Sequence, residues 1–413
     1  MIQLFINGLA ASAGGGLTYL RNVIPELGRR ETVAATILLS SGLRREFREL
    51  PNISFVEDLD FPSAIRRFFH EQTKLASLVR KCGAQVLISA GNFALWNSPA
   101  PQILLSRNSL YTSADFARDV RTRGDYAIWA DTLIKGWFAR QSIRRADVAV
   151  APSEAFAREL TEWSGREVVA VHHGFDATAF AGDSAPLPAE TQAQLSDAQG
   201  ALRLLFVSHY NYYRNFETLF RAIPILKKAM RGRRVKLYLT CWLESCQNPG
   251  TYHAEAASSL VGDLRADHDI VELGTIPYRS LHHLYHACHM YVTPAYAESF
   301  AHPLVEAMSS GLPVVASDLA VHREIGGNAA VYFPRFSPEG LAKCVLEVHN
   351  DPELATRLSR AGLARSKDFS WEKHVTRLLD LADGLVCGHE QRLRSSVVAG
   401  DQSPEDHSPN RER

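Results

Sequence analysis

Short apolar runs alternate with longer amphipathic stretches along most of the chain. Apolar runs of about four to seven residues between helical stretches predict buried parallel strands, in sheets that helices cover. The predicted helices of the first half span residues 15–29, 62–81, 114–145 and 153–163. The predicted strands span residues 2–7, 33–39, 85–89, 101–105, 147–151, 168–171, 202–207, 235–240, 270–273, 289–293, 312–316 and 330–333.

The alternation is interrupted once, over residues 177–200, where Ala, Pro, Ser, Gln and Asp dominate. This composition predicts a linker between two doubly wound α/β domains, residues 1–176 and 201–370. A last amphipathic helix is predicted over residues 371–387. Residues 388–413 are polar and lack apolar anchors, so we expect them to form a disordered tail.

Composition agrees with two packed domains and excludes little else. The chain has 413 residues, 46% of them hydrophobic, and its 45 basic residues balance 45 acidic ones. This balance gives no electrostatic argument for a nucleic-acid partner. No apolar run approaches the ~20 residues of a membrane-spanning helix, and the N-terminus lacks the pattern of a signal peptide. Six cysteines without paired spacing are typical of reduced thiols, so we expect a cytoplasmic protein.

Two glutamates lie eight positions apart in Glu298-Ser-Phe-Ala-His-Pro-Leu-Val-Glu306, a run that continues to Gly311. Pro303 suits the first turn of a helix and Gly311 its end. Glu298 is therefore predicted on the loop after a strand, and Glu306 on the helix that follows. Ligands of open α/β sheets bind at such carboxyl ends of strands, and N–H groups at a helix N-terminus bind phosphate.

This run resembles the E-x7-E element of retaining glycosyltransferases with the GT-B fold, also called glycosyltransferase family 4 or group 1. Ala301 and His302 stand where Gly-Leu is common in that element. Other positions fit its pattern: Phe300, Pro303, Ala307, Met308, Gly311 and Pro313. The resemblance implies two Rossmann-like domains that face each other across a cleft, with a C-terminal helix crossing back onto the first domain.

The resemblance also implies roles for the residues of this run. Glu306 would hold the ribose hydroxyls of a nucleotide-sugar donor, and Glu298 the hydroxyls of its sugar. Backbone groups would contact the diphosphate from a segment that comprises Ser299, Phe300, Ala301, His302 and Leu304. The leaving phosphate would assist deprotonation of the acceptor, and the sugar would keep its anomeric configuration.

The second domain opens with Val207-Ser-His209-Tyr-Asn-Tyr-Tyr-Arg214-Asn215. Similar proteins commonly carry Arg and Lys at the positions of His209 and Arg214, where they bind the donor's diphosphate. Arg214 keeps the charge of that lysine and can form two hydrogen bonds to phosphate, so we expect it to be catalytic together with Glu298. His209 either donates a hydrogen bond to phosphate or has no role there, and the sequence favours neither.

Two glycines of the first domain are further candidates. Gly15 and Gly16 belong to a glycine triplet between a strand and a helix, where backbone can approach a ligand closely. Similarity to the N-terminal glycine loop of the family favours a contact with the donor phosphate or the acceptor over an ordinary flexible turn.

Three residues are candidates on the acceptor side. Arg107 and Asn108 follow the predicted strand 101–105, where similar proteins carry His-Asp, although an ordinary polar turn explains them nearly as well. His173 lies in the turn His172-His173-Gly174 that closes the first domain, and it matches the interdomain turn of the family.

A metal site and a membrane surface are both disfavoured. His282 and His286 lie one turn apart on a predicted helix, but without further ligands a surface helix is favoured over zinc, and we expect no metal or other cofactor. Residues 61–145 carry 13 basic against 5 acidic side chains with interleaved aromatics. Peripheral contact with an anionic membrane at its inner face is one interpretation, and helices with buried aromatics are slightly favoured over it.

These features together predict a glycosyltransferase, specifically a hexosyltransferase. It would transfer a sugar with retention to a glycan, lipid-linked or small-molecule acceptor, in polysaccharide or glycoconjugate biosynthesis. Two alternatives stay open: a sugar-nucleotide epimerase of the same fold, and a catalytically silent subunit that binds a partner. His209 in place of an arginine keeps the second alternative open.

Overall fold

The computed structural model describes residues 1–400 except 12–13, 62, 183–184, 245–246 and 248–251. Within this described part the chain is an α/β protein with two parallel sheets. The strands are β1 (Ile2–Asn7), β2 (Val33–Ser40), β3 (Ile53–Asp58), β4 (Val86–Ser89), β5 (Gln102–Leu105), β6 (Val148–Ala151), β7 (Val168–Ala170), β8 (Leu202–Phe206), β9 (Val235–Leu239), β10 (Ile270–Glu272), β11 (Met290–Thr293), β12 (Val314–Ser317) and β13 (Ala330–Phe333).

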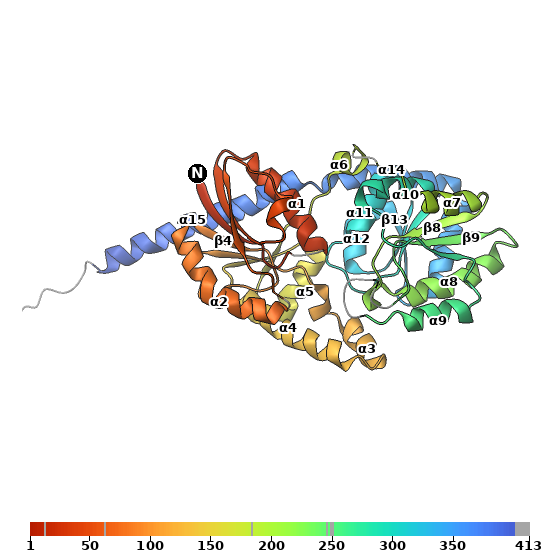
Figure 1. The fold of residues 1–413 in the computed structure, drawn as a ribbon, viewed down its shortest axis with the longest axis horizontal. Helices are drawn as coiled ribbons and strands as arrows, with labels where there is room; N and C mark the ends of the chain where they lie inside the picture. Colours follow the sequence, from red (N-terminus) through yellow and green to blue (C-terminus); the bar gives the residue numbers. More distant parts are fainter. Residues whose placement is uncertain (12–13, 62, 183–184, 245–246, 248–251, 401–413) are drawn as a thin grey trace, which may run out of the picture. The chain divides into compact units, whose positions relative to one another are not determined.

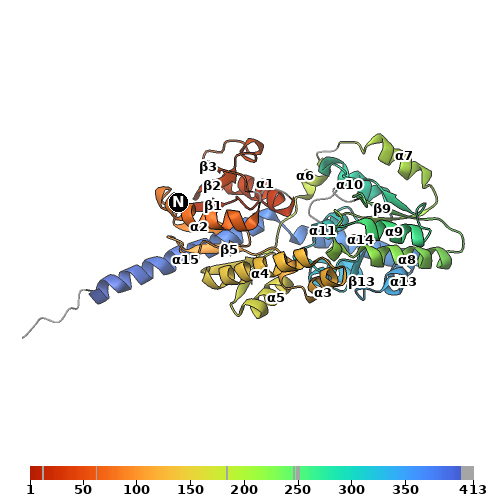
Figure 2. The ribbon, with the colours of Figure 1, turned by 60° about the horizontal axis from the view of Figure 1, so that its bottom comes forward.

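Helices connect nearly all of these strands, as parallel pairing requires. They are α1 (Gly14–Gly28), α2 (Ala64–Lys81), α3 (Ala114–Thr122), α4 (Tyr126–Arg145), α5 (Glu154–Ser164), α6 (Ala177–Gly182), α7 (Ala189–Asp197), α8 (Phe216–Ala229), α9 (Glu255–Asp263), α10 (Tyr278–Ala287), α11 (His302–Ser309), α12 (Ala320–Gly326), α13 (Pro338–Asn350), α14 (Pro352–Arg365) and α15 (Trp371–Gly400). In the views of Figures 1 and 2, α8 and α10 lie on opposite sides of the second sheet.

The strand orders are those of doubly wound folds. The first sheet has the order β3-β2-β1-β4-β5-β6-β7, and the second has β10-β9-β8-β11-β12-β13. In each sheet the order reverses direction beside the first strand, so a topological switch point lies between β1 and β4 and another between β8 and β11. The predicted fold class is therefore confirmed, and the second switch point is where a ligand is expected.

Four local expectations differ from the structure. The edge strand β3 was not predicted, because its residues are only partly buried and show no continuous apolar run. The stretch predicted as one helix over 114–145 is two helices, α3 and α4, because Gly124 adopts φ 79° and ends the first. The linker 177–200 contains the helices α6 and α7, and α15 continues to Gly400 where disorder was expected from Gly388. Residues 401–413 of the predicted tail lie outside the described residues.

Contacts divide the chain into two compact units that do not follow the predicted boundary at residue 176. The first unit contains residues 1–104, 145–148 and 375–413, and the second contains 105–144 and 149–374. Helix α3 belongs to the second unit because Phe116 and Val120, both fully buried, are part of the large core around β8 and α8.

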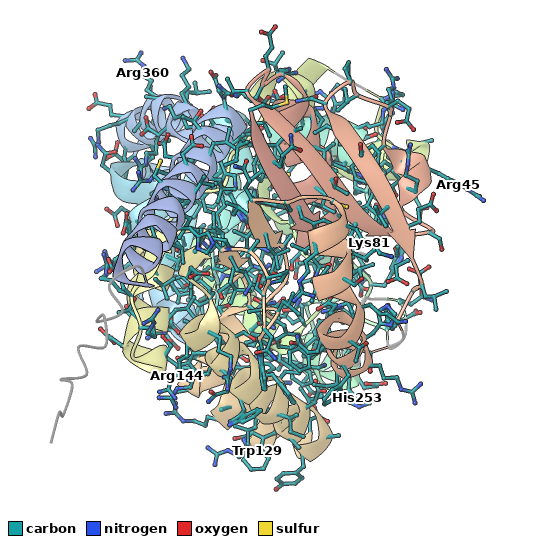
Figure 3. All side chains as sticks on the ribbon, turned by 90° about the vertical axis from the view of Figure 1, so that its left-hand side faces the viewer. Arg45, Lys81, Trp129, Arg144, His253 and Arg360 are labelled. Carbon is teal, nitrogen blue, oxygen red and sulfur yellow. The ribbon has the colours of Figure 1, made fainter. Side chains whose placement is uncertain are left out.

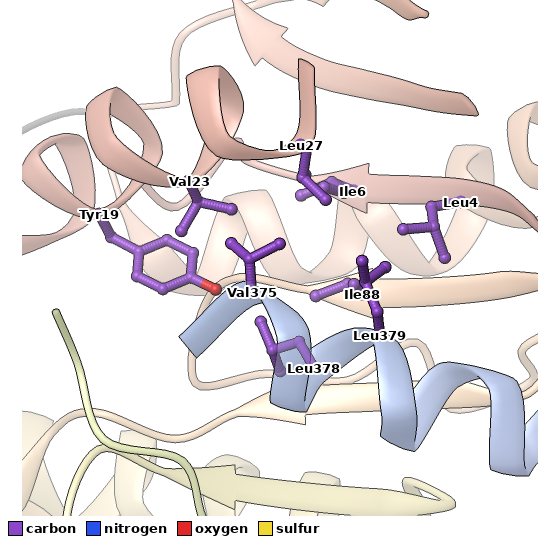
Figure 4. Close-up of a pocket in the computed structure, with 9 residues that line it drawn as sticks. All are labelled: Leu4, Ile6, Tyr19, Val23, Leu27, Ile88, Val375, Leu378 and Leu379. Carbon is purple, nitrogen blue, oxygen red and sulfur yellow. The ribbon is translucent and has the colours of Figure 1, made fainter. Parts of the chain in front are cut away.

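In the first unit, the C-terminal helix packs against the N-terminal Rossmann-like elements. Leu378 and Val375 of α15 line a small apolar pocket together with residues of β1, β4 and α1 (Figure 4). Arg30 donates a hydrogen bond of 3.1 Å to the hydroxyl of Thr376. These contacts agree with the predicted helix that returns to the first domain.

Charged side chains gather on the outside of both units. Figure 3 shows Arg45 and Lys81 of the first unit and Arg360 of the second, each projecting from the ribbon, and all three are exposed. Among the helices of the described residues, none combines the length and apolar character needed to cross a bilayer.

Candidate active site

The loops after β8 and β11 meet at the switch point of the second sheet. The N–H of Tyr296 donates to the carbonyl of Tyr213 at 2.9 Å, and the Asn215 side chain donates to the carbonyl of Pro294 at 3.1 Å. Asn215 adopts φ 56°, a left-handed conformation that asparagine tolerates better than most residues. It thereby joins the first turn of α8 to the loop that carries Glu298, a role the sequence analysis did not assign.

This meeting of loops brings Arg214 and Glu298 into an ion pair. The Arg214 guanidinium donates to the Glu298 carboxylate, and the two side chains are 19% and 11% exposed. Burial alone would raise the pKa of Glu298, but Arg214, His322 and the N–H of Ser299 lower it by more, so the pKa lies below its usual value. Glu298 is therefore ionised at neutral pH, and Arg214 stays charged beside it.

The N-terminus of α11 presents fewer free N–H groups than predicted. The N–H of Ser299 donates to the Glu298 carboxylate at 3.1 Å, and that of Leu304 donates to the carbonyl of Ala301 at 3.0 Å. Both are engaged because the loop turns tightly into the helix, with Ala301 at φ 68°. Within the described residues no acceptor faces the N–H groups of Phe300, Ala301 and His302, so the predicted phosphate-binding segment narrows to these three.

Glu306 lies on α11, one turn from its start, and is 6% exposed. The hydroxyl of Tyr285, on α10, lies 2.8 Å from the Glu306 carboxylate. Burial raises the pKa of Glu306 to about 7, and the hydrogen bond from Tyr285 opposes this only in part. The two glutamates of the run thus differ near neutral pH: one is paired and ionised, and the other is near half-protonation.

A cluster of buried aromatic and histidine rings adjoins the α11 N-terminus. His173 Nδ1 lies 3.1 Å from His302 Nε2, and their rings stack at 5.3 Å. Trp371 and His374 complete the cluster. Burial is the first cause that lowers the pKa of both His302 and His374 to about 4, so these imidazoles are neutral at pH 7.

The predicted acceptor-side residues differ in what they contact. His173 belongs to the ring cluster and has a lowered pKa from burial, His302 and His374. The charge of Arg107 acts on the same histidines, so Arg107 and His173 lie in one neighbourhood. The Asn108 side chain accepts the N–H of Leu110 at 3.0 Å and caps a short 3-10 helix, Ser109–Tyr111, so its carbonyl oxygen has a structural function.

His209 lies close enough to Arg214 for the charge of Arg214 to lower its pKa. Burial and then the charge of Arg214 lower the pKa of His209, although part of its ring is exposed. The imidazole is therefore neutral near pH 7, and its proposed contact with phosphate stays a prediction.

Gly15 and Gly16 lie in the first turn of α1, within the first compact unit, so they are helical and not part of a loop. A Cβ at Gly16 would meet the Ala11 backbone at 2.9 Å, whereas one at Gly15 would meet nothing within 4 Å. Close packing thus explains Gly16, and the predicted contact of both glycines with donor phosphate or acceptor stays a prediction.

Two residues of α12, one buried and one partly buried, have contacts that the sequence does not predict. His322 is completely buried, and it contributes to lowering the pKa of Glu298. Glu324 accepts the N–H groups of Glu154 and Ala155 at 2.8 and 2.6 Å and also contacts His172 Nε2 at 2.6 Å. It therefore ties the start of α5 and the 172–174 turn to α12. A single sequence carries no pattern that marks such long-range partners.

Among the described residues, no set of three or more His, Cys, Asp or Glu side chains is arranged to hold a metal ion. Of the histidines considered for zinc, His282 contacts the rings of His283 and His286, with ring centroids 3.8 and 6.4 Å apart.

Curated proteins similar to this chain are sugar transferases. The O-antigen chain mannosyltransferase B of Escherichia coli is 32% identical over 108 residues, which cover 26% of this chain and 28% of that protein. The D-inositol 3-phosphate glycosyltransferase of Streptomyces avermitilis is 24% identical over 62% of this chain and 55% of its own length. The chain thus spans about half of the length of the second relative and less of the first.

Solved structures show the same fold over nearly the whole chain. Sucrose-phosphate synthase from Thermosynechococcus elongatus has a TM-score of 0.73 at 16% identity and covers 94% of this chain and 100% of its own. Anabaena HepE in complex with UDP has a TM-score of 0.67 at 15% identity and covers 93% and 100%. These likenesses show the GT-B fold. Residues 189–365 also match the family model described as glycosyl transferases group 1.

Proposed function

We propose that the chain is a retaining glycosyltransferase that transfers a hexosyl group from a nucleotide-sugar donor to a hydroxyl of an acceptor. The observation that carries this proposal is the buried Arg214–Glu298 ion pair at the β8–β11 switch point, with Glu298 on the loop that leads into α11 and Glu306. The site offers groups for each part of a nucleotide sugar. They are a cation, three free N–H groups and two carboxylates that differ in protonation.

Each part of the donor then has a partner. The ionised Glu306 accepts the ribose hydroxyls, and Glu298 accepts hydroxyls of the sugar. Arg214 and the N–H groups of Phe300, Ala301 and His302 bind the diphosphate. As the bond between the anomeric carbon and the phosphate oxygen breaks, negative charge grows on the diphosphate, and preorganised donors stabilise that charge.

Retention follows if the acceptor attacks from the side that the diphosphate leaves. The acceptor oxygen then bonds to the anomeric carbon, and its proton goes to the departing phosphate oxygen. This route suits the site because His302 is neutral and poorly basic at pH 7, and the Glu298 carboxylate is paired with Arg214. No metal is needed in this proposal, since the arginine and the N–H groups meet the charge of the diphosphate.

The relatives guide the choice of donors and acceptors to test. Solved structures of Anabaena HepE are complexes with UDP and with UDP-glucose. Relatives are named for transfer to an O-antigen chain or to inositol 3-phosphate. A glycan, a lipid-linked glycan and a small polyol are therefore the acceptor classes of this proposal.

Peripheral contact with an anionic membrane belongs to the same proposal. Four large hydrophobic side chains of α4 are exposed by more than half, namely Tyr126, Leu133, Ile134 and Trp137, and Lys135 lies between the last two in the sequence. Exposed aromatic and aliphatic side chains beside cations favour the surface of an anionic bilayer. A lipid-linked acceptor would reside at that surface.

The test begins with thermal shifts for UDP-glucose, GDP-mannose and ADP-glucose, because a ligand that binds the native state raises its melting temperature. The donor that binds is then incubated with acceptors, and release of nucleoside diphosphate is measured. Glu306→Gln should weaken nucleotide binding about tenfold or more, since a hydrogen bond to a charged group contributes ~1.5–3 kcal/mol. Unchanged affinity in this variant, or no donor-dependent release in the wild type, would contradict the proposal; the second result would favour a silent subunit.

A further inference from the structure

Tyr285 has one hydroxyl proton and two acceptors within reach. Its oxygen lies 2.8 Å from Glu306 Oε2 and 3.2 Å from the carbonyl oxygen of Pro303. A carbonyl and an ionised carboxylate can only accept, so the single O–H can point fully at only one of the two oxygens. Tyr285 is completely buried, so both contacts lie away from bulk solvent.

Both contacts of the Tyr285 hydroxyl can be full hydrogen bonds in only one protonation state of Glu306. When Glu306 is neutral, its O–H donates to the Tyr285 oxygen, and the Tyr285 O–H donates to Pro303. When Glu306 is ionised, the Tyr285 O–H turns to the carboxylate and no longer donates a hydrogen bond to the Pro303 carbonyl. The short distances at both contacts therefore favour a neutral Glu306 before the donor binds.

The surroundings of Glu306 favour this neutral form. The titratable groups that face it are tyrosines, namely Tyr278 and Tyr285 of α10 and Tyr291 of β11. Among the described residues, burial and the Tyr285 hydrogen bond are what shift the Glu306 pKa, which lies at about 7, and no cation contributes. Glu298, by contrast, has Arg214 as a direct partner.

A bound ribose requires the opposite state. Its vicinal hydroxyls donate to both oxygens of one carboxylate only if that carboxylate is ionised. Resting on the function proposed above, we infer that Tyr285 is a positioning residue whose hydroxyl switches from Pro303 to Glu306 when the donor binds, so that donor binding releases a proton from Glu306. The proton leaves to solvent, and no covalent bond other than the carboxylic O–H is broken.

Isothermal titration of the full-length protein tests this directly. The nucleotide sugar with the largest thermal shift among the three named donors is titrated in two buffers of different ionisation enthalpy, at pH 6 and at pH 8. A nucleotide sugar is a suitable probe because its diphosphate does not titrate in this range. We expect close to one proton to be released per donor bound at pH 6, and only a small fraction of one proton at pH 8. The affinity for the donor should fall up to about tenfold per pH unit below pH 7.

Three variants test which side chain releases the proton and which one sets its pKa. Glu306→Gln should abolish the release. Tyr285→Phe should move the pH midpoint of donor affinity upward, because the hydrogen bond that lowers the Glu306 pKa is gone. Tyr291→Phe is the matched control, a buried tyrosine facing Glu306 that makes no hydrogen bond to it, and it should leave release and midpoint unchanged. A purely structural role of Tyr285 would weaken binding equally at every pH.

The outcomes separate this inference from the proposed function. Donor binding with the same proton count in the wild type and in Glu306→Gln overturns the inference and leaves the proposed function standing. Donor binding in Tyr285→Phe with an unmoved midpoint overturns the role of Tyr285. A wild type that binds none of the three donors contradicts the proposed function, and with it the inference.

Discussion

Two different free energies depend on the Arg214–Glu298 pair, and replacing Arg214 by alanine changes both. The side chains are 19% and 11% exposed, so Arg214→Ala leaves a buried carboxylate without its cation. Breaking a buried ion pair from one side costs about 3–5 kcal/mol of folding free energy. The same substitution removes the cation proposed for the diphosphate, and loss of one such electrostatic contact lowers kcat by ~10²–10³. A low activity alone therefore does not establish a catalytic role.

A companion variant separates the two effects. In Arg214→Ala/Glu298→Gln no buried charge is left unpaired, so most of the lost stability should return while turnover stays low. Arg214→Lys keeps a cation and should recover part of both. Arg221→Ala removes an exposed arginine from the neighbouring helix α8 and serves as the matched control, with wild-type stability and turnover expected.

The pH dependence of thermal stability gives a third test. In the wild type Arg214 helps to hold the pKa of Glu298 below its usual value. In Arg214→Ala burial is no longer opposed by that charge, so the folded-state pKa rises above the unfolded value. A raised pKa of this kind gives destabilisation that is present at high pH and relieved as the carboxyl protonates. The deficit in Tm relative to the wild type should therefore be larger at pH 8 than at pH 5.

The assays are release of nucleoside diphosphate at saturating donor and thermal unfolding at both pH values. Full-speed turnover in Arg214→Ala would refute the assignment and place the diphosphate elsewhere. Unchanged Tm in the same variant would refute the argument from burial, because the stranded carboxylate would then be hydrated. His209→Ala completes the set: a loss of turnover would show that His209 shares the phosphate, and wild-type turnover would remove it from the site.

Further predictions concern the metal, the backbone, the histidine cluster and the membrane. Turnover should survive excess EDTA, and loss that Mg²⁺ or Mn²⁺ restores would contradict the proposed phosphate site. Ala301→Gly should stabilise the fold by ~0.5–1 kcal/mol in chemical denaturation, because Ala301, just before α11, has φ 68°. Ala307→Gly, inside α11, is the control and should destabilise the fold by about 1 kcal/mol. The pKa of His302 lies at about 4, below its unfolded value, so its contribution to stability is full above pH 6.5 and is lost as the pH falls toward 4. His302→Leu should therefore flatten the fall of Tm between pH 7 and 5, and His268→Gln, an exposed control, should not. Trp137→Ser should reduce co-sedimentation with vesicles of anionic lipid; equal binding to neutral vesicles would contradict the membrane contact.

Most strands could be predicted because each is buried on both faces and appears as a continuous apolar run. β11 and β12 have every residue buried, and the sequence predicted both within two residues. β3 was missed because an edge strand needs no such run. The helices α6 and α7 were missed for another reason: a composition rich in Ala, Gln and Ser is compatible with helix and linker alike.

The site was predictable where its chemistry is local. The order of Glu298, Pro303, Glu306 and Gly311 along the chain indicates a loop, a helix start, a helical carboxylate and a helix end, and the structure has all four. What could not be predicted depends on residues distant in sequence. Tyr285 reaches Glu306 across 21 positions, and Arg214 reaches Glu298 across 84. The difference in protonation between the two glutamates follows from these partners, because spacing alone treats both carboxylates alike.

The pairing of Arg214 with Glu298 orients the proposed phosphate-binding cation without consuming it. A guanidinium carries five N–H donors in a planar fork, and the contact to Glu298 is made through Nη1. The carboxylate therefore positions the guanidinium, and donors remain for phosphate oxygens. A lysine has one ammonium group on a flexible stem, and its attraction to Glu298 would compete directly with its attraction to phosphate. Arg214→Lys should for this reason recover stability, which needs only the charge, more completely than turnover, which needs both contacts at once. A lysine variant with full turnover and poor stability would reverse this order and contradict the argument that the planar fork is what turnover needs.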